Sequence, residues 1–61
     1  MPTIFFYGPE LDLEKRRELV QSFTKKASEL TGIPEQAFVV YLRPSDQEHV
    51  GVGGMLLSDR K

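Results

Sequence analysis

Two short segments, residues 3–7 and 38–42, are hydrophobic almost throughout, so each would place apolar side chains on both faces of a sheet. A strand of this kind needs a cover over each face. The 61-residue chain contains one amphipathic segment long enough to serve, residues 13–31, and a single helix covers a single face. The cover for the second face must come from another molecule, and the sequence therefore predicts association with further copies.

Turn signals define the ends of the two apolar segments. Residues 3–7 are rich in β-branched and aromatic side chains and stop at Gly8-Pro9, while residues 38–42 stop shortly before Pro44. Both segments are predicted to be short buried strands. Because a helix connects them, they should form a β-α-β unit with parallel strands and a right-handed crossover.

The segment between the strands carries start and stop signals of a helix. Asp12 is a suitable N-cap, Gly32 is placed to cap the C-terminus, and Pro34 prevents continuation, which predicts a helix over residues 13–31. Apolar residues recur within it at steps of three and four, as expected for a helix that packs on a sheet. The predicted stripe consists of Leu13, Val20, Phe23, Ala27 and Leu30, with Leu19 beside it.

Glycines are concentrated near the C-terminus. Gly51, Gly53 and Gly54 alternate with apolar residues and precede the apolar run Met55-Leu56-Leu57. Glycines at this density indicate tight turns. We predict a hairpin or arm that contacts a neighbouring subunit; the alternative is a loop folded over the chain's own sheet edge.

The chain is too short to hold more than one domain, residues 1–61, of the α+β class. A single chain of this size buries only about 60% of the surface that its unfolded form exposes, so such domains need disulfides, metals or oligomerisation. The sequence has no cysteine and a single histidine, His49, which leaves oligomerisation. Nothing in the sequence indicates a metal or a cofactor.

The charge pattern argues against nucleic-acid binding. The chain has eight Lys and Arg residues and nine Asp and Glu residues, for a net charge of −1. Nucleic-acid binders, in contrast, carry a basic excess. The basic residues of the helix alternate with acidic ones, which is typical of a solvated face. This face comprises Lys15, Arg16, Arg17, Lys25 and Lys26 with Glu14, Glu18 and Glu29. No apolar run is long enough for a membrane span and no signal peptide is visible, so we expect a cytoplasmic protein without membrane partners.

Pro2 is the candidate catalytic residue. Removal of Met1 would expose the secondary amine of Pro2 as the chain terminus. An apolar pocket disfavours the charged form of an amine, and a neutral amine acts as a general base or as a nucleophile towards a carbonyl. The alternative is that Pro2 only begins a strand, a position that tolerates proline. If Met1 is retained, the nitrogen is an amide and has neither activity.

Several motifs in this order resemble the 4-oxalocrotonate tautomerase family over essentially the whole chain. They are Met1-Pro2-Thr3-Ile4, a helix that begins near Leu13-Glu14-Lys15-Arg16, the helix end Gly32-Ile33-Pro34, a hydrophobic strand, and His49-Val50-Gly51-Val52-Gly53-Gly54. The resemblance implies the tautomerase fold, also seen in macrophage migration inhibitory factor. It further implies a homohexamer built as a trimer of dimers, and an amino-terminal proline that moves protons in enol and keto acids.

The chain departs from the family at the residues that hold carboxylates. The family pattern has one arginine just before the helix, where this chain has Glu10-Leu11-Asp12, and another on the second strand, where it has Phe38-Val39-Val40. An aromatic residue often precedes the late glycines, and Val50 stands there instead. The resemblance thus implies a divergent member that lacks both active-site arginines.

The predicted pocket is mostly apolar. It is lined by Pro2, Val39 and Val50, with Leu11 nearby, which favours a weakly charged or hydrophobic carbonyl or enol substrate. Two further residues could contribute to substrate binding. Arg43 is either a site residue or a solvent-facing arginine, and Tyr41 is either a hydrogen-bond donor or part of a core or interface.

Two functions from different classes follow from these residues. The first is keto–enol isomerisation with Pro2 as the general base. The second is a non-catalytic oligomeric binding or scaffold protein that keeps the fold. Retention of Met1 in the native protein would favour the second.

Overall fold

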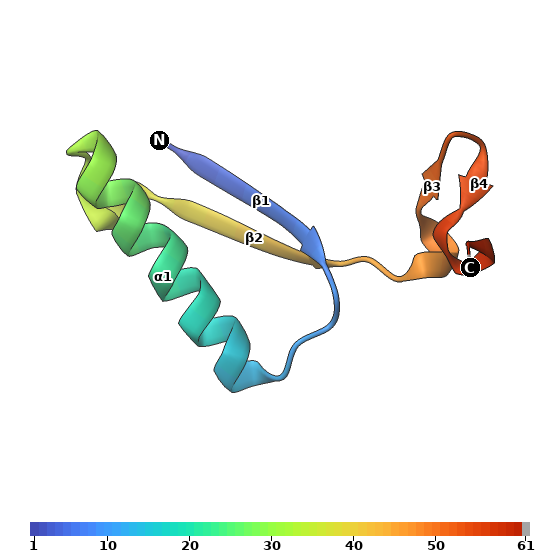
Figure 1. The fold of residues 1–61 in the computed structure, drawn as a ribbon. Coiled ribbons are helices and arrows are strands. Elements are labelled where there is room, and N and C mark those ends of the chain that lie inside the picture. The colour runs from blue at the N-terminus through green and yellow to red at the C-terminus, as the bar shows by residue number, and fades with distance from the viewer. Residues whose placement is uncertain (61) are drawn as a thin grey trace.

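The computed structural model describes residues 1–60 and shows a β-α-β unit followed by a small hairpin (Figure 1). Strand β1 spans Thr3–Gly8, helix α1 spans Leu13–Thr31, and strand β2 spans Val39–Pro44. The two strands are parallel, as predicted, with β1 paired to β2 along its whole length. Helix α1 lies along one face of this two-stranded sheet (Figure 1).

The strand ends differ slightly from the sequence prediction. Both strands extend past their apolar runs, to Gly8 and Pro44, because main-chain pairing continues there. Strand β2 begins one residue later than predicted, since the Phe38 N–H donates to the Glu35 carbonyl at 3.1 Å and closes a short 3-10 turn at Glu35–Ala37.

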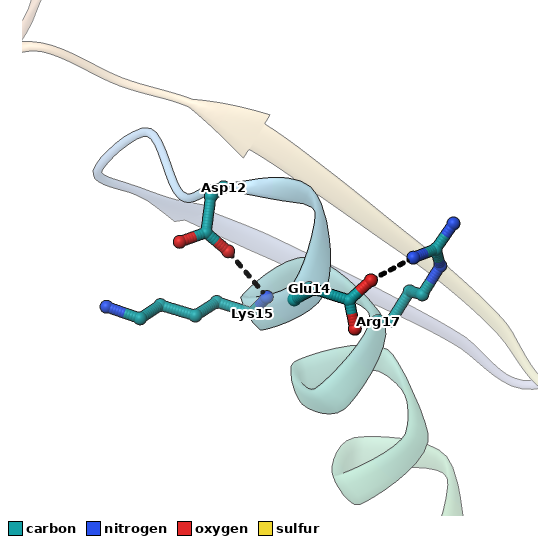
Figure 2. A network of polar contacts seen from close by, with 4 residues as sticks. All are labelled: Asp12, Glu14, Lys15 and Arg17. Carbon is teal, nitrogen blue, oxygen red and sulfur yellow. Dashed lines mark hydrogen bonds and ion pairs between the residues drawn. The ribbon is translucent and has the colours of Figure 1, made fainter.

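Both predicted helix caps are confirmed. The Asp12 side chain accepts a hydrogen bond from the Lys15 main-chain N–H at 2.9 Å (Figure 2). In the same turn, Glu14 forms an ion pair with Arg17. At the other end, Gly32 has a φ of 77° and its N–H donates to the Ser28 carbonyl at 2.9 Å. This left-handed conformation suits glycine and explains why the helix stops there.

Only the middle of α1 packs against the sheet. The Phe23 ring contacts the Phe6 ring with centroids 5.7 Å apart, and Val20 is partly buried nearby. The predicted stripe is too long, because Leu13 is 53% exposed and Leu30 is 79% exposed. A 19-residue helix is about 28 Å long and a six-residue strand about 20 Å, so the helix ends overhang the strands.

Within residues 1–60, no helix combines the length and apolarity needed to cross a membrane.

The C-terminal glycine-rich segment is a hairpin, as predicted. Strands β3 (Gly51–Val52) and β4 (Met55–Leu56) are antiparallel. The connecting residues Gly53 and Gly54 have φ values of 62° and 87°, the pattern of a type I′ turn. The hairpin stands apart from the β-α-β unit and does not cover its sheet edge (Figure 1). Val52, Met55 and Leu56 are all exposed, so the arm carries apolar surface without a cover.

The described chain has no closed core of its own. Among residues 1–60 no side chain is fully buried. The accessible surface is 5110 Å² for a 7.0 kDa chain, against about 4,000 Å² for a compact monomer of that mass. The radius of gyration is 14.7 Å, against about 10.5 Å for a compact domain of this length. This excess surface is available to partner molecules, and the association itself stays a prediction.

We expect Asp12→Ala to lower the free energy of unfolding by about 1 kcal/mol, because an N-terminal amide loses its acceptor. Asp12→Asn is the matched control, since asparagine caps helices about as well as aspartate. Urea unfolding followed by circular dichroism, at one fixed protein concentration, measures both. Equal losses in the two variants would show that the charge of Asp12, and not its cap, stabilises α1.

Candidate functional site

Pro2 and Val39 are neighbours in the structure. Pro2 directly precedes β1, and its carbonyl accepts a hydrogen bond from the Val39 N–H at 3.0 Å. Both residues are partly buried. The parallel register places Thr3 opposite Val39, so the start of β1 is fixed beside the start of β2. The chain terminus left by removal of Met1 would therefore lie at a defined point on the sheet.

The other predicted pocket residues lie at the opposite end of the sheet. Leu11 is in the loop between β1 and α1, and Val50 lies beyond the end of β2, at the base of the hairpin. Strand β1 has six residues, which separates Pro2 from Leu11 by about 20 Å. The N-terminus and the hairpin also lie at opposite ends of the molecule (Figure 1). A single chain does not bring Pro2 together with Leu11 or Val50.

An aromatic ladder lies on the sheet face opposite α1. The rings of Phe5 and Tyr41 stack with centroids 4.9 Å apart and planes 9° apart. The Arg43 guanidinium carbon lies 5.4 Å from the Tyr41 ring centroid, a cation–π contact. Phe5 is 54% exposed and Tyr7 is 68% exposed, which shows that this face has no cover within the described chain.

A small hollow of about 40 Å³ lies between the C-terminal ends of β1 and β2 and the first turns of α1. Phe6, Leu11 and Leu42 give it apolar walls, and Arg16 and Arg43 also line it. The structure thus brings Leu11 and Arg43 to one place, away from Pro2.

Arg16 is exposed, as expected for the solvated helix face, and it also lines this hollow. The sequence contains a signal for this position. Arg16 lies three residues before Leu19 and four before Val20, which are both partly buried. Residues at these spacings share a helix face. Arg17, one position later, instead pairs with Glu14.

A wider groove of about 730 Å³ separates the end of β1 from the hairpin. Val50 lines it, beside His49 and Asp46. The Asp46 carboxylate accepts hydrogen bonds from the His49 ring Nδ1 at 2.7 Å and from the Glu48 N–H at 2.9 Å. The hydrogen bond with His49 is the main cause that lowers the pKa of Asp46. His49 itself is exposed.

Comparison with known proteins identifies a common family. The family model described as "Tautomerase enzyme" matches residues 2–60. A 2-hydroxymuconate tautomerase of Bacillus subtilis (strain 168) is 37% identical over 46 residues, which cover 75% of this chain and 74% of that protein.

Solved structures agree with this match. DmpI from Archaeoglobus fulgidus superposes with a TM-score of 0.83 and 40% identity, over 95% of this chain and 100% of the other. YwhB, a homologue of 4-oxalocrotonate tautomerase, superposes with a TM-score of 0.85 and 31% identity, over 98% of this chain and 100% of the other. These similarities confirm the fold that the sequence motifs implied.

The Asp46 contacts predict an acid-sensitive turn at the base of the hairpin. A carboxyl group whose pKa is lower in the folded state stabilises that state above its unfolded pKa, and the contribution is lost as the pH falls through the folded pKa. We expect the Glu48 amide resonance to shift below about pH 4 as its acceptor is protonated. NMR titration from pH 5 to pH 2 measures this shift. Asp46→Asn should flatten the titration, and an unchanged curve would assign it to another carboxyl group.

Proposed function

Because the chain belongs to the tautomerase family, we propose that it is a 4-oxalocrotonate tautomerase-like isomerase whose general base is the Pro2 nitrogen, freed by removal of Met1. The observation that carries the proposal is the position of Pro2. It is partly buried at the start of β1 and hydrogen-bonded through its carbonyl to Val39. The amine would thus be held in a fixed orientation beside an apolar side chain.

The proposed reaction needs only a proton carrier. The neutral proline amine accepts the hydroxyl proton of an enol, and the resulting ammonium returns a proton to carbon to give the ketone. Apolar surroundings favour the neutral amine between turnovers, because desolvation penalises its charged form. Proton transfer by a positioned group of this kind contributes about 10²- to 10⁴-fold to a rate.

We further propose that the site is completed by other subunits of a homohexamer, arranged as a trimer of dimers. Leu11 and Val50 both lie beyond the strand ends, at least about 20 Å from Pro2 of the same chain, so they reach a shared pocket only if another chain supplies them. The uncovered aromatic face and the exposed hairpin supply apolar surface for such contacts. Val39, next to Pro2, would come from the same chain as the base.

The proposed substrate is a weakly charged or hydrophobic carbonyl or enol compound. Leu11 and Val39 stand where the family pattern has arginines, so the cationic groups that would hold a dicarboxylate are absent from those two positions. The Bacillus subtilis relative is named for a dicarboxylate, 2-hydroxymuconate. For this chain we propose weak turnover of such substrates, because donors aimed at developing negative charge supply several kcal/mol of transition-state stabilisation.

Pro2→Ala should lower the rate of phenylpyruvate ketonisation by at least about 100-fold, since the positioned secondary amine is lost. Ultraviolet absorbance of the enol measures the rate, on protein shown by intact mass to lack Met1. The matched control is the wild-type chain with Met1 retained, prepared with the host methionine aminopeptidase inhibited, and it should be equally inactive. Equal rates in wild type and Pro2→Ala would reject the proline base, and equal rates at the uncatalysed level would support the non-catalytic scaffold function instead.

Sedimentation velocity tests the assembly. Wild-type protein should sediment at about six times the 7.0 kDa subunit mass. Phe5→Glu should give smaller species, because it places a charge among stacked rings on the uncovered face. Gln21→Glu, on the exposed side of α1, is the control and should leave the assembly intact. A wild-type monomer at micromolar concentration would contradict the proposal.

A further inference from the structure

The hollow at the C-terminal ends of the strands combines an apolar interior with a cation. Phe6, Leu11 and Leu42 contribute apolar walls, and Arg16 lines it from α1. Its volume of about 40 Å³ exceeds the 10–15 Å³ or so that a single water needs, which leaves room for a small polar head group. The hollow therefore has the two components that an amphipathic anion requires.

Arg16 is the cation available in this hollow. Within residues 1–60 the ion pairs are those of Arg17, Lys26 and His49, and none involves Arg16. Arg43 also lines the hollow, but its guanidinium carbon lies over the Tyr41 ring on the other face of the sheet.

Glu10 is the acidic residue of the lining. Its negative charge offsets part of the positive charge of the two arginines that line the hollow, so the lining balances one carboxylate and disfavours a dicarboxylate.

We propose that this hollow binds the carboxylate of a small monocarboxylic acid with an apolar tail, with Arg16 as its ion partner. The guanidinium offers paired N–H donors that match a carboxylate. Leu11 and Leu42 receive the start of the tail. This assigns a binding site and narrows the ligand class to hydrophobic monocarboxylates, including 2-keto acids and their enols.

The role of the hollow in catalysis rests on the proposed function. Pro2 of the same chain is about 20 Å away, beyond the reach of a small acid held by Arg16. A substrate anchored in one chain would therefore meet the proline of another copy. Binding itself does not depend on this step, and the two can be tested separately.

The test compares phenylacetate with its uncharged analogue phenylacetamide. Titrations of the assembled wild-type protein are followed by amide NMR shifts of Leu11 and Leu42. Phenylacetate should bind at least about tenfold more tightly than phenylacetamide, because only the charged carboxylate can form a charge-assisted pair of hydrogen bonds with the guanidinium. Arg16→Gln should remove this preference.

Arg17→Gln is the matched control, because it removes an adjacent arginine that pairs with Glu14 and does not line the hollow. It should keep the full preference for phenylacetate. Equal affinities for the two probes, or equal losses in both variants, would overturn the proposal. Leu11→Trp provides a second variant that fills the hollow and should abolish binding of both probes while sedimentation shows an intact assembly.

Pro2→Ala separates this inference from the proposed function. If the hollow binds as proposed, the Pro2→Ala variant keeps its affinity for phenylacetate, whether or not its rate of phenylpyruvate ketonisation falls. Unchanged ketonisation together with Arg16-dependent binding would reject the proline base and keep the site. Lost ketonisation with binding that ignores Arg16 would keep the base and reject the site.

Discussion

The structure depends on one constraint: a two-stranded sheet that is apolar on both faces has a single helix to cover it. Helix α1 packs through Phe23 on Phe6 and leaves the other face open. On that face the stacked rings of Phe5 and Tyr41 lie at the surface, although rings of this size contribute most when buried. The chain therefore has a well-defined backbone without a closed interior. Part of its apolar surface is left uncovered within the described chain.

The same constraint divides the candidate site. A parallel pair joined by a crossover helix has both strand starts at one end and both strand ends at the other. Pro2 and Val39 precede or begin strands, whereas Leu11 and Arg43 follow or end them, so about 20 Å of sheet separates the two groups. Pro2 and the apolar walls of the hollow thus lie at different ends of the chain. A pocket that combines them would need more than one copy of the chain.

Much of the fold was predictable because its determinants are local. Asp12 and Gly32 fix the ends of α1 through contacts within one turn, and Gly53-Gly54 fixes the hairpin through backbone conformation. The overhang of Leu13 and Leu30 was not predictable, since it depends on how far the strands extend beneath the helix. Arg16 and Arg17 are both exposed, as predicted, but only Arg16 lines the hollow. Charge alternation describes both residues, and the spacing of Arg16 to Leu19 and Val20 is the sequence signal that separates them.

The kind of interaction that each residue of the candidate site can make with a substrate decides whether it would raise kcat or only lower KM. An arginine near a developing enolate stabilises the transition state more than the ground state and so raises kcat. Apolar contacts with Leu11 or Val39 would stabilise both states about equally, which lowers KM without raising kcat. An ion pair between Arg16 and the substrate carboxylate would also stabilise the ground state and the transition state about equally, because the carboxylate keeps its charge throughout the reaction.

In the proposed mechanism, no residue therefore supplies the transition-state stabilisation that the two missing arginines would provide. Binding energy from a hydrophobic tail and a single carboxylate can hold and orient the substrate. Orientation towards the proline nitrogen is itself a source of rate, since it removes the entropic cost of bringing base and proton together. What such a site lacks is strong polarisation of the carbonyl. It should accordingly favour substrates that enolise readily on their own, such as 2-keto acids whose enol is conjugated with an aromatic ring, over those that need an electrophile to become acidic.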